Sequence, residues 1–305
     1  MHKKVLITGA SGFLGSHIAE KFLIQGWKVI GLKRISSNLW RCEDFVDQIE
    51  WLDVDSEKFS EQIIDLCPDV IIHSAWGGVA ANDRVQYKPQ LNNLKLLLDL
   101  LNIANAVKCK FIGLGSQAEY GTFFGKIDEQ YPVDPNTAYG VVKLMSCSLV
   151  RGFCNANELD WFWLRLFPVF GEKEDDNWLI PSVIKKVALG AEMELTPGLQ
   201  RYAYIYVKDL SACVFKIASL YLSKSVSGIY NISGEGAITL RELVEKIRDA
   251  VDVKVKLNFG ALNYRPYQSM YMEGDTTKFS QNINKIIFSD FNESLNKTIQ
   301  YYLAK

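Results

Sequence analysis

Two residues in the segment YGVVK have the types and spacing needed for proton transfer. Tyr139 and Lys143 are four positions apart, so on a helix their side chains face the same side. A phenol with a pKa of about 10 is a poor base at neutral pH, but a nearby ammonium group favours the phenolate. A Y-x-x-x-K pattern is common by chance, so its meaning depends on the elements that position it.

A second polar cluster stands in GLGSQAEYG, residues 113–121, where Ser116 follows an apolar run. Its hydroxyl could donate a hydrogen bond to a reacting oxygen. Glu119 is the carboxylate of this stretch, and the alternation of a strand would point it away from the face used by Ala118 and Tyr120. We therefore expect a structural role for Glu119.

Short apolar strands alternate with amphipathic helices as far as residue 167. We expect strands at 4–9, 27–34, 48–54, 69–75, 110–115 and 159–167, and helices at 14–26, 59–68, 89–107 and 137–157. Strands that are apolar on both faces indicate a parallel sheet covered by helices on both sides. The predicted fold class is α/β, a Rossmann-like doubly wound parallel sheet followed by a smaller α/β part.

The segment TGASGFLGS places Gly9, Gly12 and Gly15 between the first strand and the first helix. Glycines at this point allow a tight turn and let the backbone approach a pyrophosphate, which the helix N-terminus stabilises. Three glycines alone are a weak signal, but their place in a βαβ array indicates a dinucleotide site. Their G-x-x-G-x-x-G spacing differs from the G-x-G-x-x-G of the ordinary dinucleotide fold.

TGxxGFxG, the serine before Tyr-Gly and the YxxxK pair together resemble the extended short-chain dehydrogenase/reductase family, in its group of nucleotide-sugar epimerases, dehydratases and reductases. The resemblance covers nearly the whole chain. It implies that Tyr139 exchanges a proton with the sugar while hydride passes to or from nicotinamide. It further implies that Lys143 holds the ribose and that Ser116 binds the reacting oxygen.

The same resemblance implies which residues contact the dinucleotide. The expected set is Gly9, Ser11, Gly12, Phe13, Leu14, Gly15, Lys33, Arg34, Asp53, Val54, Ser74, Ala75, Trp76, Asn93, Tyr139, Lys143, Phe167 and Val169. His73, at the end of a strand in HSAW, is expected to be a buried structural histidine rather than a catalytic one.

The end of the second expected strand bears on the choice of cofactor. Members that use NAD place an acidic residue there, whereas this chain has Lys33 and Arg34 in GLKRISS. Two cations at this point could bind the 2′-phosphate of NADP(H). Alternatively, they are ordinary solvent-exposed side chains at the end of a strand. We expect NADP(H), with NAD(H) as the alternative.

Relatives differ in the two residues that follow the serine. The 4,6-dehydratases have Asp-Glu where this chain has Gln117 and Ala118, and the nucleotide-sugar decarboxylases keep a glutamate at the second place. An amide and a methyl group cannot transfer protons, so reduction of a keto-sugar or epimerisation remains. GSQAEYG and NFGALNYRP resemble the 4-keto-6-deoxyhexose reductases of the CDP-abequose synthase type.

The substrate motifs of the resemblance are partly altered. Pro168 replaces an asparagine that usually contacts the diphosphate, and Tyr202 stands where an arginine belongs. Arg201, one residue earlier, could substitute for that arginine, and Arg265 matches a pyrophosphate-binding arginine. The expected substrate-binding residues are Ser116, Gln117, Arg201 and Arg265.

The strand–helix rhythm breaks after residue 170, which suggests two domains. We expect an NAD(P)-binding Rossmann domain at residues 1–167 with a returning segment at about 203–232. Residues 168–202 and 233–305 would form the domain that binds the nucleotide sugar. Thr239 and Glu242 have the spacing of a helix capping box.

Composition excludes several classes of partner. The net charge of −1 offers no basic field for nucleic acid, and no apolar run is long enough for a membrane span. The six cysteines are scattered without a CxxC pair, which favours free thiols in the cytoplasm, and with only three histidines we expect no metal site.

The main hypothesis is an NADP(H)-dependent reductase of a nucleotide-linked 4-keto-(6-deoxy) sugar. The alternative is a nucleotide-sugar 4-epimerase that holds NAD tightly, and a less favoured one is a non-catalytic dinucleotide-binding partner subunit. In relatives the helices matching 89–107 and 137–155 pair across a four-helix bundle, so we expect a homodimer. The sequence leaves open the nucleotide base, the sugar and the stereochemistry.

Overall fold

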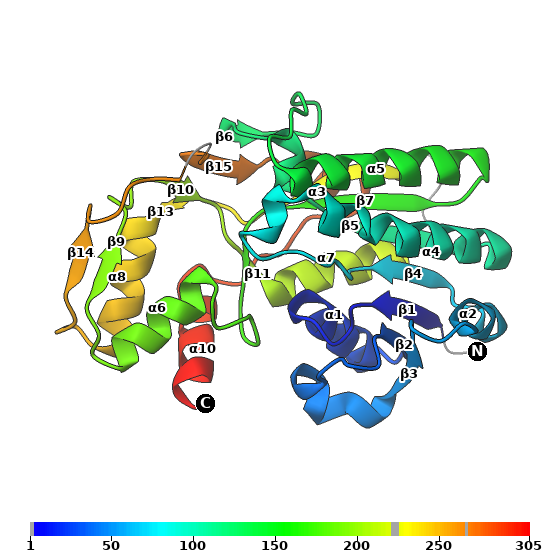
Figure 1. Ribbon diagram of the computed structural model, residues 1–305, viewed down its shortest axis with the longest axis horizontal. Helices are drawn as coiled ribbons and strands as arrows, with labels where there is room; N and C mark the ends of the chain where they lie inside the picture. Colours follow the sequence, from blue (N-terminus) through cyan, green and yellow to red (C-terminus); the bar gives the residue numbers. More distant parts are fainter. Residues whose placement is uncertain (1–2, 221–225, 266–267) are drawn as a thin grey trace.

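A seven-stranded parallel sheet forms the centre of the larger lobe. The computed structural model describes residues 3–220, 226–265 and 268–305 (Figure 1). The strand order is β12-β7-β5-β4-β1-β2-β3, and every pairing is parallel. The strands are β1 (Lys4–Thr8), β2 (Lys28–Lys33), β3 (Ile49–Asp53), β4 (Val70–His73), β5 (Lys110–Ser116), β7 (Trp161–Leu166) and β12 (Gly228–Ile232). The predicted fold class is confirmed.

Helices cover both faces of this sheet because its strands are apolar on both sides. Val5 and Ile7 of β1 pack in one core with α1 (Phe13–Ile24) and α7 (Val207–Ser219). Leu6, between them, points to the opposite core. The helices of that second core are α2 (Phe59–Leu66), α4 (Asn93–Val107) and α5 (Ala138–Ala156).

The helix expected at 89–107 is interrupted. The structure has a short α3 (Tyr87–Leu91) and then α4, with Asn92 between them. The Asn93 side chain donates hydrogen bonds to the carbonyls of Pro89 and Gln90, at 3.2 and 2.9 Å. A side chain that occupies these carbonyls competes with the regular helical ladder, which accounts for the break.

The smaller lobe is built around three helices. These are α6 (Leu179–Ala188), α8 (Leu240–Val251) and α10 (Phe291–Leu303), flanked by the pair β9 (Met193–Leu195) and β14 (Leu257–Phe259). Val183, Leu243 and Ile299 lie in their shared core. The capping box of Thr239 and Glu242 is present at the start of α8. Strands β1 and β4 of the main sheet point toward this lobe (Figure 1).

Short strands connect the two lobes. One sheet has the order β13-β10-β15-β6, and β11 (Ile205–Tyr206) pairs with β8 (Val169–Phe170). The four strands of the first of these sheets are β6 (Phe124–Ile127), β10 (Arg201–Tyr202), β13 (Ile238–Thr239) and β15 (Tyr271–Gly274). The segment before α7 holds two short strands, β10 and β11, which pair in different sheets.

The remaining helices are short. They are η1 (Trp40–Gln48), η2 (Asp83–Val85), η3 (Gln117–Tyr120) and α9 (Thr277–Asn282). Of the helices that the structure describes, none has the length and apolar character of a membrane span. The described part of the chain also contains no group of three or more His, Cys, Asp or Glu side chains placed to bind a metal.

Candidate active site

The three expected catalytic residues meet where β5 ends and α5 begins. Ser116 is the last residue of β5, and Tyr139 is the second residue of α5. Thr137 caps this helix by accepting a hydrogen bond from the Gly140 N–H at 3.1 Å. The Ser116 side chain lies close enough to Tyr139 to lower the pKa of its phenol. Lys143, one turn further along α5, is buried and donates to the Leu114 carbonyl at 2.7 Å.

Ser116 is held by its own turn. Its Oγ accepts a hydrogen bond from the Ala118 N–H, and its own N–H donates to Oε1 of Glu119 at 2.9 Å. This is a capping box at the start of η3. Because Oγ already accepts one hydrogen bond, the hydroxyl hydrogen is what Ser116 can offer to a reacting oxygen.

The buried carboxylate of Glu119 links that turn to the neighbouring strand β7. It is fully buried, its Oε2 accepts a hydrogen bond from Arg165 Nε at 2.8 Å, and its Oε1 accepts another from Trp163 Nε1 at 2.8 Å. The strand alternation expected at Glu119 is wrong, because Gln117–Tyr120 is helical. The contacts of its carboxylate are nevertheless structural ones.

Two glycines of GLGSQAEYG are required by close packing. A Cβ on Gly115 would lie 2.2 Å from Trp163 Nε1 and 2.5 Å from Glu119 Oε1, so a side chain would displace the anchor. Gly121 has a φ of +76°, and a Cβ there would lie 1.9 Å from the Asp134 carbonyl oxygen. Both glycines therefore keep the Ser116 turn in place.

The charges around Tyr139 differ from the sequence-based expectation. Burial raises the pKa of Tyr139, while the Arg84 guanidinium and the hydrogen bond with Ser116 lower it and Glu119 raises it. Burial lowers the pKa of Lys143 to about 7, against the opposing effect of Glu119. Lys143 Nζ is 5.9 Å from the centroid of the Tyr139 ring, so the nearer cation is Arg84, at 4.1 Å.

Sequence reasoning missed Arg84 and Gln90. Arg84 lies in η2, on the loop after β4, and its guanidinium covers the Tyr139 ring. Gln90 is fully buried in α3 and accepts a hydrogen bond from Trp76 Nε1 at 2.8 Å. No motif marks either residue, because an arginine in a polar loop and a glutamine in a short helix are both unremarkable in a sequence.

The β1–α1 turn fits a dinucleotide pyrophosphate. Gly9 has a φ of +67°, and its backbone lies so near Ala75 that a Cβ would approach the Ala75 backbone to 2.9 Å. Gly12 is the N-cap residue of α1 and offers no side-chain cap, and the first turn of the helix has no acidic residue. An uncapped helix N-terminus beside glycines is a ready anion site. The residues expected to contact the cofactor here, Gly9, Ser11, Gly12, Phe13, Leu14 and Gly15, all belong to this turn and the first turn of α1.

The neighbouring strand ends complete this edge of the sheet. The Thr8 hydroxyl is 2.9 Å from His73 Nδ1 and accepts a hydrogen bond from the Ala75 N–H. His73 is buried, and burial lowers its pKa to about 3, so it is neutral. Ser74 and Trp76 follow on the same segment, which Asn93 binds through the Gly77 N–H at 2.7 Å.

The end of β2 carries an ion pair that the sequence did not suggest. Lys33 Nζ lies 2.6 Å from Oδ1 of Asp53, at the end of β3, with Val54 next in the chain. Arg34 is exposed at the same edge. A carboxylate is therefore present beside the second strand after all, although it comes from the third.

The expected substrate residues are more widely spread. Gln117 is half-buried in η3 beside Ser116, and Arg265 is exposed in the segment before β15. Arg201 donates to the Ala237 carbonyl at 3.1 Å and lies against the Tyr271 ring. Tyr202 points to the other face of β10, where its hydroxyl donates to the Ser269 carbonyl.

Two further predicted cofactor residues lie after β7. Phe167 is buried against Gly274, whose Cβ, if present, would lie 2.5 Å from the ring. Val169 is in β8, partly buried against the core of the smaller lobe.

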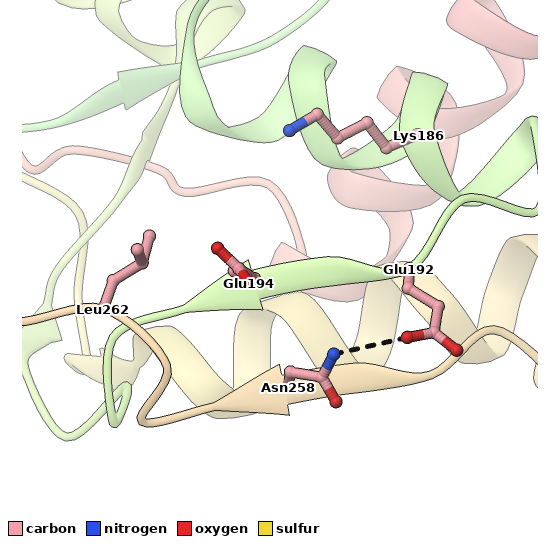
Figure 2. A pocket seen from close by; sticks show the side chains of 5 residues that line it. All are labelled: Lys186, Glu192, Glu194, Asn258 and Leu262. Atoms are coloured by element: carbon pink, nitrogen blue, oxygen red, sulfur yellow. Dashed lines mark hydrogen bonds between the residues drawn. The ribbon is translucent and has the colours of Figure 1, made fainter.

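A separate hollow on the smaller lobe is lined by Lys186, Glu192, Glu194, Asn258 and Leu262 and contains none of the predicted site residues (Figure 2).

Comparison with known proteins gives this arrangement a family. The model of the NAD dependent epimerase/dehydratase family matches residues 5–233. The chain belongs to this family. The resemblance to the extended short-chain dehydrogenases/reductases is thereby confirmed, and so is the expectation of an enzyme.

Curated relatives extend over most of the chain. CDP-abequose synthase from Salmonella muenchen is 28% identical over 281 residues, covering 91% of this chain and 90% of that protein. The dTDP-6-deoxy-L-talose 4-dehydrogenase (NAD(+)) from Aggregatibacter actinomycetemcomitans is 28% identical, covering 88% of this chain and 98% of that protein.

Solved structures of other proteins have the same fold as this chain. The UDP-N-acetylglucosamine 4-epimerase from Methanobrevibacter ruminantium, in complex with UDP-N-acetylmuramic acid, superposes with a TM-score of 0.87 at 22% identity, covering 99% of both chains. The UDP-glucuronic acid 4-epimerase from Bacillus cereus, in complex with UDP-glucuronic acid and NAD, gives 0.85 at 20% identity, again covering 99% of both chains.

The residues at this site suit proton exchange with a carbinol or carbonyl oxygen. A nicotinamide dinucleotide bound along the strand ends would supply or accept the hydride. Ser116 can donate a hydrogen bond to the reacting oxygen, and Tyr139 can give it a proton or take one from it. The nearest carboxylate, Glu119, is fully buried and paired with Arg165, so it is not placed to act as a second acid or base.

Proposed function

We propose that this protein reduces a nucleotide-linked 4-keto-(6-deoxy) sugar with NADP(H), with Tyr139 as the proton donor. The observation that carries this proposal is the composition of the Ser116 turn. Its side chains offer one hydroxyl, one amide and one methyl group, and its carboxylate is committed to Arg165. Eliminating water or carbon dioxide needs a further acid or base that this turn does not present.

Two relatives support a 6-deoxy sugar with chemistry at carbon 4. One is a CDP-abequose synthase, and the other is a 4-dehydrogenase of dTDP-6-deoxy-L-talose. A 4-dehydrogenase runs, in reverse, as a 4-keto reductase. We propose a nucleotide sugar of this class as the substrate, bound through Ser116, Gln117, Arg201 and Arg265.

For the cofactor, we propose NADP(H) in preference to NAD(H). Exposed Arg34 stands at the end of β2, where a guanidinium can bind a 2′-phosphate through two hydrogen bonds. Asp53 partly neutralises Lys33, so Arg34 would carry most of the discrimination. The NAD(+)-linked relative keeps NAD(H) as the alternative.

A second candidate function is a 4-epimerase that holds NAD tightly and returns the hydride to the same sugar. The family description and a UDP-glucose 4-epimerase from Lactobacillus helveticus, 21% identical, favour it. It needs the same three residues. A non-catalytic subunit is less favoured, because a binder has little need of Ser116, Tyr139 and Lys143 together.

The stoichiometry of the cofactor separates these functions. Purified protein is mixed with NADPH and either CDP- or dTDP-4-keto-6-deoxyglucose, and the loss of NADPH is compared with the sugar product formed. The reductase consumes one NADPH for each sugar reduced. Interconversion of two nucleotide sugars without consumption of NADPH would instead establish the epimerase.

We also propose that the enzyme works in the cytoplasm as a homodimer. Free thiols fit that compartment, and the described cysteines form no disulfide. Leu98 on α4 and Met145 on α5 are 44% and 46% exposed, which gives this helical face apolar surface for a second copy. The division into a Rossmann domain (1–167 and about 203–232) and a substrate domain (168–202 and 233–305) is likewise proposed.

A further inference from the structure

The loop between β4 and α3 is held by two side-chain amides, the buried Gln90 and the half-buried Asn93. Gln90 Nε2 donates to the carbonyls of Gly78 and Asp83, at 2.6 and 3.1 Å. Its Oε1 accepts from Trp76 Nε1, and Asn93 binds both backbone groups of Gly77. The loop that carries Arg84 is therefore tied to the helices at several points.

This fastening places Arg84 on the ring of Tyr139. The guanidinium carbon lies 4.1 Å from the centroid of that ring, within the range of a cation–π contact. Trp76 also meets the Tyr139 ring edge to face at 6.1 Å, and Lys143 Nζ lies 3.6 Å from the centroid of the Trp76 ring. The Tyr139 ring therefore contacts both Arg84 and Trp76.

The titratable and charged groups around Tyr139 come from five elements. Arg84 in η2 and the Ser116 hydroxyl at the end of β5 favour the phenolate, while Glu119 in η3 opposes it. Lys143 of α5 is turned toward the Leu114 carbonyl. His73 on β4, buried near Lys143, is neutral. The cation placed to act directly on the phenol is Arg84.

We propose that Arg84 is a positioning residue that holds the Tyr139 ring and stabilises its ionised form during turnover. This inference rests on the proposed role of Tyr139 in proton exchange. In reduction, Tyr139 gives its proton to the carbonyl oxygen as that carbon receives hydride from the reduced dinucleotide, so the carbonyl becomes a hydroxyl and Tyr139 a phenolate. Arg84 then faces the new negative charge.

The sign of the expected effect follows from the charge. Removing the guanidinium removes a group that favours the phenolate, so the pKa of Tyr139 rises. Reduction needs the protonated phenol, so the fall of its kcat/KM at high pH moves to a higher pH. Oxidation needs the phenolate, so the rise of its kcat/KM with pH also moves to a higher pH, and the oxidation rate at neutral pH falls.

The first test needs no substrate. Protein labelled with ¹³Cζ-tyrosine and saturated with NADP⁺ is titrated by NMR, and the Tyr139 signal is identified as the one missing from Tyr139→Phe. Arg84→Gln should raise the titration midpoint of this signal, and Arg84→Lys should restore most of the difference. Arg248→Gln, a matched change on α8 in the smaller lobe, should leave it unchanged.

The second test is the pH profile of kcat/KM, in both directions, for the wild type, Arg84→Gln, Arg84→Lys and Arg248→Gln. The proposal is supported if the pH at which kcat/KM changes is higher in Arg84→Gln than in the wild type and returns toward the wild-type value in Arg84→Lys. An unmoved midpoint in the NMR titration, or a uniform loss of rate at every pH, would overturn it. If wild-type protein turns over no nucleotide sugar, the proposed function fails, while the NMR titration still decides the role of Arg84.

Discussion

At the scale of single residues, the proposed chemistry rests on Tyr139. Tyr139→Phe keeps the ring that contacts Arg84 and Trp76 but removes the hydroxyl that would donate the proton. We expect kcat to fall by about 10²- to 10⁴-fold, the usual contribution of a general acid. Binding of NADPH, followed by fluorescence, should change little.

Tyr87→Phe is the matched control, because Tyr87 is 56% exposed at the start of α3. Its kinetics should match those of the wild type. Undiminished turnover in Tyr139→Phe would remove Tyr139 from the mechanism.

Arg34 is the residue on which the proposed preference for NADP(H) depends. Arg34→Gln should lower kcat/KM for NADPH by about 10- to 100-fold, the loss expected for a charge-assisted hydrogen bond. Activity with NADH should stay within about twofold, since NADH lacks the 2′-phosphate. Steady-state kinetics with both cofactors, and with Arg248→Gln as control, check this prediction. Equal losses with the two cofactors would contradict a 2′-phosphate contact.

At the scale of elements, the Ser116 turn depends on what lies beneath it. Glu119→Gln leaves the buried guanidinium of Arg165 without its counter-charge, and breaking a buried pair costs about 3–5 kcal/mol. We expect the free energy of unfolding, measured in urea, to fall by roughly that amount. The kcat should fall too, because the Ser116 N–H loses its carboxylate acceptor.

Glu57→Gln is the control for this change, since Glu57 is exposed before α2. Its unfolding curve should coincide with that of the wild type. Wild-type stability in Glu119→Gln would show that the turn does not depend on the buried pair.

At the scale of the whole molecule, the prediction concerns assembly into a dimer. We expect light scattering after size exclusion to give about twice the chain mass of 34.6 kDa. The double change Leu98→Glu with Met145→Glu should yield the single-chain mass, because charges would be buried in the helical interface. Ile24→Glu, at a residue 71% exposed on α1, should leave the dimer intact. A wild-type protein with the mass of one chain would contradict the four-helix bundle.

The sequence by itself determined the parts that local rules govern. Apolar strands alternating with amphipathic helices predicted the parallel sheet, because burial on both faces requires such strands. The glycines at 9, 12 and 15 predicted the turn before α1, because that turn requires a positive φ and close backbone approach. The spacing of Tyr139 and Lys143 predicted a shared face of a helix, as found in α5.

Tertiary structure decided what lies between elements distant in the chain. Glu119 meets Arg165, 46 positions away, and Lys33 meets Asp53, 20 positions away, only because parallel strands bring their ends together. Arg84 reaches Tyr139 because Gln90 and Asn93 fasten an irregular loop to α3 and α4. Such contacts have no sequence period, so the charge that faces the catalytic phenol became visible only in the folded chain.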